Sequence, residues 1–364
     1  MNKVYIWQQE LWCQLMQSGK FGGYALLLKG RCGIGKFEFA RQFAKSLLCK
    51  NPSIDRKACG SCPSCGWFEQ GGHPNFYQVE PDALSGLSDD VALGLDVEGS
   101  ASTSSTKLKK KPSQQISVDQ IRALNDFINL SGNQDGCKII LIHPAETMNL
   151  AAGNALLKKL EEPPPNVLFI LVTHRPQHLL PTIRSRCQQM TMPNPDIATA
   201  TDWLKQQGIK DPDVCLAAAG FAPLSALLFN DSEYIAQHEA FIKQISMPED
   251  LNPIILAEKL QQSDLSAVVS WLQKWCYDLL SFQLTGKIRY HLSRRSAIES
   301  LVINMNTKAL VTYSRSLIST QQLSHHPLNS RLFLEEVLFA YIFLANKRKG
   351  ISWTKPLSRR NIPT

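Results

Sequence analysis

The 364-residue sequence has no run of 18 or more apolar residues, although 44% of its residues are hydrophobic. A membrane-spanning helix needs such a run, so we expect no membrane span. The first residues, MNKVYIWQQELWCQLMQ, carry charged and amide side chains throughout and lack the apolar centre of a signal peptide. No internal repeat is evident either. These absences predict a globular protein of the cytoplasm.

The ten cysteines should be reduced in that compartment, so clustered cysteines indicate a metal rather than disulfides. Cys59, Cys62 and Cys65 form C-x2-C-x2-C, and Cys49 precedes them by ten positions. Four thiolates can enclose one Zn²⁺, and a closed set of four suits a structural site. An iron–sulfur cluster is the alternative, but the x3-C-P continuation of ferredoxin-type runs is missing. We therefore predict a structural zinc module over residues 49–65.

The other six cysteines are scattered, and we predict that they are buried thiols. They are Cys13, Cys32, Cys137, Cys187, Cys215 and Cys276. The net charge of +8 favours anionic partners weakly. Part of it comes from KLKKK at 107–111 and from the C-terminal tail, which we interpret as solvated segments.

Short apolar runs alternate with helical patterns in the first half of the chain. Buried strands are predicted at 24–29, 137–143 and 166–174, with a fourth after the segment LLPTIRSRC. Helices are predicted between them, at 37–49, from about 117 to 130, and from 149 until the prolines at 163–165. This alternation predicts an α/β core, a parallel sheet with helices on both faces. Residues 83–115 are rich in Ser, Gly, Asp and Lys, and we expect a flexible insertion.

Strand patterns stop after residue 193. We predict three domains: an α/β core over 1–193, a small helical unit over 194–240 and an all-α domain over 241–364. Apolar stripes at helical spacing follow 265–279 and 332–344. Such stripes are usually core.

The stretch LLLKGRCGIGKFEF at 26–39 has the pattern of a phosphate-binding loop. Gly30, Gly33, Gly35 and Lys36 match G-x-x-x-x-G-K, placed between a predicted strand and a helix. Glycines allow backbone N–H groups to surround phosphate oxygens, and the lysine adds a positive charge. The next position holds Phe37, which has no hydroxyl to bind Mg²⁺. The loop therefore indicates descent from a nucleotide-binding protein. It does not indicate that the chain itself is an ATPase.

Hydrolysis also needs an acidic pair at the end of a neighbouring strand. The strand at 139–142 is followed by His143 and Pro144, which supply no carboxylate. Glu146 lies two positions further on, and we interpret it as a residue at the start of a helix. Two separate parts of an ATPase site are thus missing.

A third motif is PTIRSRCQQ at 181–189. From spacing alone, Arg186 is a surface arginine. An arginine fixed at the edge of such a sheet could also reach a neighbour's nucleotide site as an arginine finger.

Together these residues resemble the clamp-loader branch of the AAA+ ATPases. The stretch AAGNALLKKLEEPPPNVLFILVTHRPQHLLPTIRSRCQ is similar to the most recognisable part of bacterial clamp-loader subunits, and the cysteine cluster lies where they carry a zinc module. The resemblance covers about residues 3–82 and 116–230. It implies an AAA+ core, a helical lid and a C-terminal collar domain.

Within that branch, the resemblance favours a stator subunit over an ATP-hydrolysing gamma/tau-type motor subunit. Motor subunits would have Ser or Thr at 37, Asp-Glu at 143–144 and a nucleotide-sensing arginine in the lid. The matching lid stretch AGFAPLSALLF contains no basic residue. The resemblance implies that Arg186 is a finger acting on a motor subunit. It also implies that Thr173, where motors sense the γ-phosphate, is a remnant or a plain strand-end residue.

The implied partners are the delta and gamma/tau subunits of the clamp loader of DNA polymerase III, the sliding clamp and primer–template DNA. ATP binding by the chain itself stays open at this point. A different class of function is a zinc-dependent DNA-binding protein. Against it, aromatic and basic residues do not alternate around 59–65.

Overall fold

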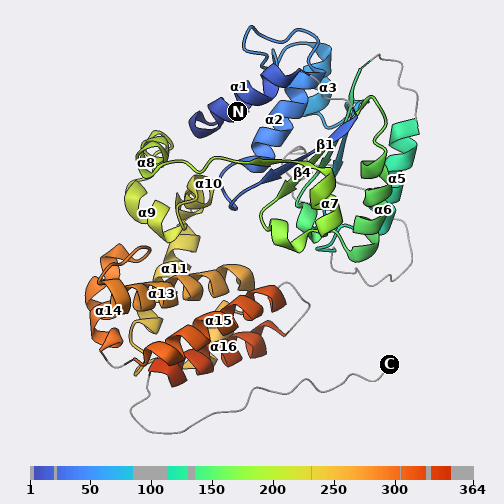
Figure 1. Ribbon diagram of the computed structural model, residues 1–364. Coiled ribbons are helices and arrows are strands. Elements are labelled where there is room, and N and C mark those ends of the chain that lie inside the picture. Colours follow the sequence, from blue (N-terminus) through green and yellow to red (C-terminus); the bar gives the residue numbers. More distant parts are fainter. Residues whose placement is uncertain are drawn as a thin grey trace, which may run out of the picture. The chain divides into compact units, whose positions relative to one another are not determined.

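The computed structural model describes residues 4–19, 23–84, 113–129, 136–230, 232–303, 305–324 and 329–345. The chain forms two compact units, coloured along the sequence in Figure 1. The first comprises Met1–Trp203 with Ala222–Ser225, and the second comprises Leu204–Phe221 with Ala226–Thr364. Nearly all of the predicted insertion at 83–115 and the basic tail lie outside the described residues. The division into three domains stays a prediction.

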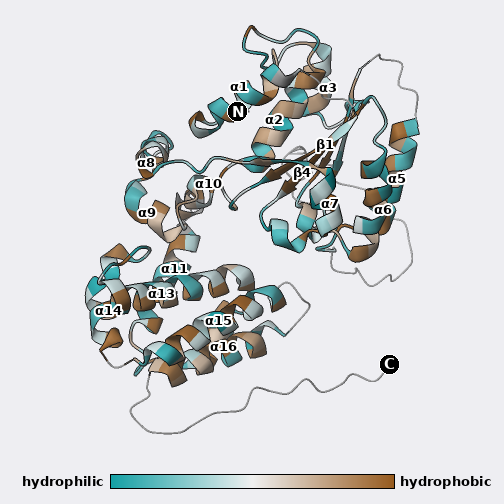
Figure 2. Cartoon of the chain, in the orientation of Figure 1, coloured by the Kyte–Doolittle hydropathy of each residue, from teal (hydrophilic) through white to brown (hydrophobic). Residues whose placement is uncertain are grey.

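The first unit contains a parallel sheet of five strands in the order β2-β3-β4-β1-β5. The strands are β1 (Tyr24–Lys29), β2 (Phe76–Val79), β3 (Lys138–Ile142), β4 (Val167–Thr173) and β5 (Gln188–Thr191). The central strands are apolar, as their brown colour in Figure 2 shows, and β4 is buried throughout. The predicted parallel α/β sheet is confirmed, but β2 was not expected from the sequence.

Helices cover both faces of this sheet, because alternate side chains of each strand point to opposite sides. Leu26 and Leu28 pack with α1 (Gln9–Ser18), α2 (Lys36–Leu48) and α3 (Pro63–Glu69). Ala25 and Leu27 pack with the helices of the other face. These are α5 (Val118–Asn129), α6 (Leu150–Glu161) and α7 (Pro181–Arg186).

Helix starts follow the capping residues of the sequence. Ser117 and Gln120 bond each other's backbone N–H groups before α5, a capping box. Asn149 accepts from the N–H of Ala152 at the start of α6, 2.8 Å away. Short 3-10 turns complete the first unit at Ile6–Gln8 (η1), Ala145–Thr147 (η2) and Pro176–His178 (η3).

Beyond the sheet the described chain is helical. The helices are α8 (Ile197–Gln206), α9 (Pro212–Ala218), α10 (Pro223–Ala226), α11 (Ser232–Ile245), α12 (Pro253–Leu260), α13 (Leu265–Thr285), α14 (Arg295–Val302), α15 (Thr307–Leu323) and α16 (Ser330–Ala345), with 3-10 turns η4 (Leu227–Asn230) and η5 (Leu292–Arg294). None of the helices described is long and apolar enough to cross a membrane.

The stripe on α13 is core, as the sequence predicted. Val269, Trp275 and Leu279 have no exposed surface. The Trp275 indole N–H donates to the Tyr341 hydroxyl on α16 at 2.9 Å, and that hydroxyl donates to the carbonyl of Ile245 at 2.7 Å. The hydrogen-bonded pair therefore joins three helices inside the second unit.

The prediction for the scattered cysteines was partly wrong. Cys187 and Cys276 are buried, and Cys137 and Cys215 are partly exposed. Cys13 and Cys32 are exposed, because the first lies on the outer face of the amphipathic helix α1 and the second lies in the glycine loop.

Candidate functional site

The glycine loop connects β1 to α2, as a phosphate-binding loop requires. Gly33 and Gly35 have φ angles of 73° and 85°, a left-handed conformation that glycine adopts without strain. At Gly30 the reason for glycine is close packing, because an added Cβ would lie 2.9 Å from the Ile34 Cδ1 atom. Lys36 begins α2 and is 2% exposed. The local form of a phosphate loop is thus kept.

Protein atoms pack directly on the loop. A Cβ at Gly35 would lie 2.5 Å from the ring of Tyr5, and one at Gly33 would lie 2.1 Å from Ser225 Oγ. The side chain of Gln8 donates to the carbonyls of Ile34 and Gly35 at 3.0 and 2.9 Å. Contacts within the chain therefore require glycine at 33 and 35, independently of any phosphate.

The ammonium group of Lys36 is turned toward the loop itself, where it donates to the carbonyl of Arg31. Burial lowers the pKa of Lys36 to about 8, opposed by the nearby Cys32, Glu146 and Glu38 side chains. The lysine is thus still mostly charged at pH 7.

Phe37 stands where a magnesium-binding hydroxyl was expected, and His143 stands where the first residue of an acidic pair was expected. The two side chains are in contact. Their rings stack with centroids 4.5 Å apart, and His174 meets His143 edge-on at 5.5 Å. Burial lowers the pKa of His143 and of His174 to about 4, so both rings are neutral at pH 7. The two residues therefore form part of an uncharged aromatic cluster, which contains no hydroxyl or carboxylate of its own.

Glu146 lies in η2 beside this cluster, and its Oε1 accepts from the backbone N–H of His174 at 2.9 Å. The carboxylate therefore ties η2 to the end of β4, in addition to starting a helical turn. Thr173 ends β4 and is fully buried, and its Oγ1 accepts from the N–H of Arg175 at 3.1 Å. That bond closes the strand-end turn.

Arg186 is the last residue of α7 and its side chain is 34% exposed. Its Nη2 donates to Glu161 Oε1 at 2.7 Å, and its Nη1 donates to the carbonyl of Thr182 at 3.1 Å. These bonds engage two of the five N–H donors of the guanidinium. The arginine is thus a surface residue, held at one end of α6 and α7.

The four predicted metal ligands come together. The Sγ atoms of Cys49, Cys59, Cys62 and Cys65 all lie within 4.8 Å of one another. Cys49 is the C-terminal cap of α2, and Cys62 is the N-terminal cap of α3, with Pro63 in the first helical position. The turn between the ligands uses Gly60 at φ 76°.

The sulfur spacing fits one tetrahedral metal ion. A Zn–S bond of about 2.3 Å places two ligands about 3.8 Å apart. The distances from Cys49 to Cys59, from Cys49 to Cys62 and from Cys59 to Cys65 are 3.5, 3.8 and 4.0 Å. Backbone N–H groups of Ser61 and Cys62 lower the pKa of Cys59 to about 6, which favours the thiolate that binds metals. The cluster can therefore hold a metal such as zinc.

A buried hydrogen-bond chain fixes this module to α2. The N–H of Asn75 donates to His73 Nδ1 at 3.0 Å, so His73 Nε2 carries the proton toward Ser64 Oγ at 2.9 Å. Ser64 Oγ in turn donates to the carbonyl of Leu48 at 2.6 Å. Burial lowers the pKa of His73, which keeps the ring neutral and this chain intact.

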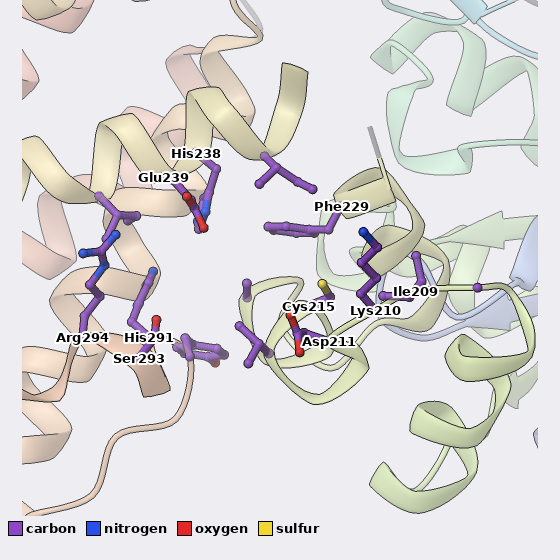
Figure 3. A pocket seen from close by; sticks show the side chains of 16 residues that line it. Ile209, Lys210, Asp211, Cys215, Phe229, His238, Glu239, His291, Ser293 and Arg294 are labelled. Atoms are coloured by element: carbon purple, nitrogen blue, oxygen red, sulfur yellow. The ribbon is translucent and has the colours of Figure 1, made fainter. Parts of the chain in front are cut away.

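A pocket of about 460 Å³ lies in the second unit (Figure 3). His238 and Glu239 of α11 line it, together with His291 and Arg294 around η5 and Cys215 of α9. Burial lowers the pKa of His238 to about 3, and the neighbouring His291, Lys274 and Arg294 contribute. No residue that the sequence singled out for chemistry lines this pocket.

The sequence did not single out the residues that cover and support these sites. Tyr5 and Gln8 lie in an N-terminal stretch whose apolar residues recur with a roughly helical period, and Glu161 lies at the end of a predicted helix. The only local signal was the pair of acidic residues before three prolines, which placed Glu161 and Glu162 at a helix end. Their contacts are set by tertiary structure.

The family model and the similar sequences point to the same family. A family model described as DNA polymerase III, delta subunit matches residues 8–196. DNA polymerase III subunit delta' of Pseudomonas aeruginosa is 33% identical over 291 residues, covering 78% of this chain and 80% of the relative. The subunits delta' of Haemophilus influenzae and Yersinia pestis are each 28% identical, over 295 and 332 residues. They cover 78% and 88% of this chain, and 79% and 89% of the relatives.

The family model spans more than half of the chain, and the glycine loop, the parallel sheet and the cysteine cluster all lie within its bounds. The chain belongs to the delta' subunits of the DNA polymerase III clamp loader.

Proposed function

We propose that this delta' subunit is a stator: it does not hydrolyse ATP, and it donates Arg186 to the ATP site of a neighbouring motor subunit. The observation that carries the first half is the stack of Phe37 on His143. Magnesium requires oxygen ligands, and ATP hydrolysis requires the metal at this place. Two aromatic rings in contact supply no oxygen ligand and therefore hold no magnesium. The loop formed by Gly30, Gly33, Gly35 and Lys36, together with Thr173, is then a remnant of a nucleotide site. The proposal requires no ATP bound there.

The second half is supported by the surface position of Arg186. The side chain stands at a helix end, with a third of its surface exposed and most of its N–H donors unengaged. A planar guanidinium with free donors matches the charge that develops on a transferring phosphoryl group.

Complex partners follow from the family, and we propose the delta and gamma/tau subunits, the sliding clamp and, through the complex, primer–template DNA. Residues 194–240 would form the lid and residues 241–364 the collar that joins the subunits. Exposed apolar side chains on α16 support a contact surface there: Leu332, Phe339 and Phe343 are 61%, 49% and 41% exposed. No membrane is involved in this role, which we assign to the cytoplasm.

The test of the arginine finger is hydrolysis by a complex reconstituted from the cognate subunits. The motor subunits should carry alanine at their own trans-acting arginine, so that hydrolysis reports the single site that Arg186 serves. A finger contributes about 10³-fold or more to the rate at its site. Arg186→Ala should therefore silence DNA-stimulated hydrolysis, and the subunit should remain folded.

Arg122→Ala is the matched control, because Arg122 is another exposed arginine that pairs with a carboxylate of its own unit, Asp119. It should leave the rate unchanged. Full activity of the Arg186 variant would refute the finger. Hydrolysis by the purified chain that Lys36→Ala abolishes would refute the stator and favour a motor subunit.

We propose zinc as the metal of the four-cysteine cluster, in a structural role. Because four thiolates complete a tetrahedral shell, no position is open for catalysis. Metal analysis of the purified protein should give about one Zn per chain, and Cys65→Ser should release it. Stripping the metal should speed tryptic cleavage at Lys50, Arg56 and Lys57. A metal-free protein with unchanged cleavage would contradict this assignment.

A further inference from the structure

Glu161 and Arg186 are the last residues of α6 and α7, and their contact joins the ends of these two closely packed helices. Gly153 of α6 permits this approach, because a Cβ there would lie 3.1 Å from Leu180 Cδ1 and 3.8 Å from Ile183 Cδ1 of the facing segment. The packing sets the distance between the C-terminal ends of α6 and α7. It thereby brings the carboxylate of Glu161 within 2.7 Å of Arg186 Nη2.

Two acceptors from different elements hold the guanidinium by its two terminal nitrogens. Glu161 Oε1 accepts from Nη2, and the carbonyl of Thr182 accepts from Nη1. A planar group held at two atoms has a fixed plane and direction. An arginine side chain otherwise loses about 2 kcal/mol of rotamer freedom when it is ordered.

We propose that Glu161 is a positioning residue for the arginine finger: its carboxylate orders Arg186 on this subunit before the neighbour's ATP arrives. The inference rests on the proposed role of Arg186. The carboxylate stays bonded to Nη2. Nη1 and Nη2 each have a second N–H, and Nε has one N–H, so three donors remain for the phosphoryl oxygens. Ordering then precedes the chemical step, so it raises the turnover rate at a constant KM for ATP.

The neighbouring carboxylate offers a matched control. Glu162 is also exposed and is the C-terminal cap of α6. The carboxylate bonded to Arg186 is that of Glu161, not that of Glu162. Glu161→Ala and Glu162→Ala remove the same charge from the same surface. Any difference between them therefore reports the contact with Arg186 rather than the local field.

The experiment uses the single-site complex described above. Glu161→Ala should lower kcat about two- to five-fold, the range of a surface ion pair, with KM for ATP unchanged. Glu162→Ala should match the parent, and Glu161→Gln, which keeps an acceptor oxygen, should recover part of the loss. In the Arg186→Ala background, adding Glu161→Ala should have no further effect.

The two failures are distinguishable. If Arg186→Ala itself leaves hydrolysis intact, the finger is wrong and so is the proposed function. If Arg186→Ala silences the site while Glu161→Ala behaves like Glu162→Ala, raises the rate, or lowers only the melting temperature, then Glu161 does not position the finger.

Discussion

At residue 143 an imidazole stands in the place of a carboxylate, and its environment keeps it uncharged. Burial is the main cause of its lowered pKa; the nearby His174 and Lys36 side chains lower it further, and Glu146 opposes them. A histidine whose folded pKa of about 4 lies below its unfolded value of 6.5 binds more protons when unfolded. Its contribution to stability is therefore complete above pH 6.5 and is lost as the pH falls toward 4.

This gives a prediction for acid stability. His143→Phe keeps a ring stacked on Phe37 but removes the imidazole that titrates. The variant should therefore lose less stability between pH 7 and pH 5 than the unsubstituted protein. The difference should be about 1–2 kcal/mol, measured by urea unfolding at both pH values. His178→Gln, at an exposed histidine, serves as the control. Equal losses in the parent and in His143→Phe would contradict the assignment.

How well residues could be predicted depended on sequence distance. Cys59, Cys62 and Cys65 lie within seven positions, so spacing alone predicts their meeting. Phe37 and His143 follow β1 and β3, which are separated in the sheet by β4. Strand order cannot be read from hydrophobic patterns, so each residue could be identified as a departure, but their stacking could not be foreseen.

At the scale of elements, long buried strands were predictable, and of the two short edge strands β5 was predicted and β2 was not. β1 and β4 have continuous apolar runs, because both faces of the sheet are covered. β2 has four residues, FYQV, of which only Val79 is fully buried. With one fully buried side chain, β2 carries too little hydrophobic pattern to be distinguished from a loop by that pattern alone.

The three-helix hydrogen-bond chain in the second unit gives an element-scale prediction. Tyr341→Phe removes a buried hydroxyl that bonds both Trp275 and Ile245, leaving a donor and an acceptor unpaired. The loss should be about 1–3 kcal/mol in urea unfolding. Tyr277→Phe makes the same chemical change on α13, where the side chain is 43% exposed, and should be nearly neutral. Similar losses for both variants would be inconsistent with this account.

At the scale of the whole molecule, the apolar stripes separate into core and surface. Buried side chains of α16 such as Leu334, Leu338 and Tyr341 pack inside the second unit. Leu332, Phe339 and Phe343 recur at helical spacing on its exposed side. The sequence predicted an apolar stripe on this helix but could not say which of its residues are core, because that depends on how the helices pack.

Phe339→Glu should therefore weaken assembly with the cognate clamp-loader subunits while leaving the fold intact. Loss of one buried phenylalanine contact should lower affinity about tenfold or more, measured by co-purification and by titration of the complex. Ile54→Glu, at a fully exposed position of the cysteine loop, is the control and should assemble normally. Normal assembly of the Phe339 variant would remove this face of α16 from the proposed contact surface.

The stack of Phe37 on His143 also bears on how this subunit can evolve. Serine at 37 alone would remove one ring of the stack and still leave an imidazole where a carboxylate is needed. Aspartate at 143 alone would place a charge against a phenyl ring, which is unfavourable in a partly buried site. Each single reversal thus reduces stability and restores no metal site. If the proposed stator role holds, return to ATP hydrolysis would require coincident mutations, and the loss of hydrolysis would then be hard to reverse.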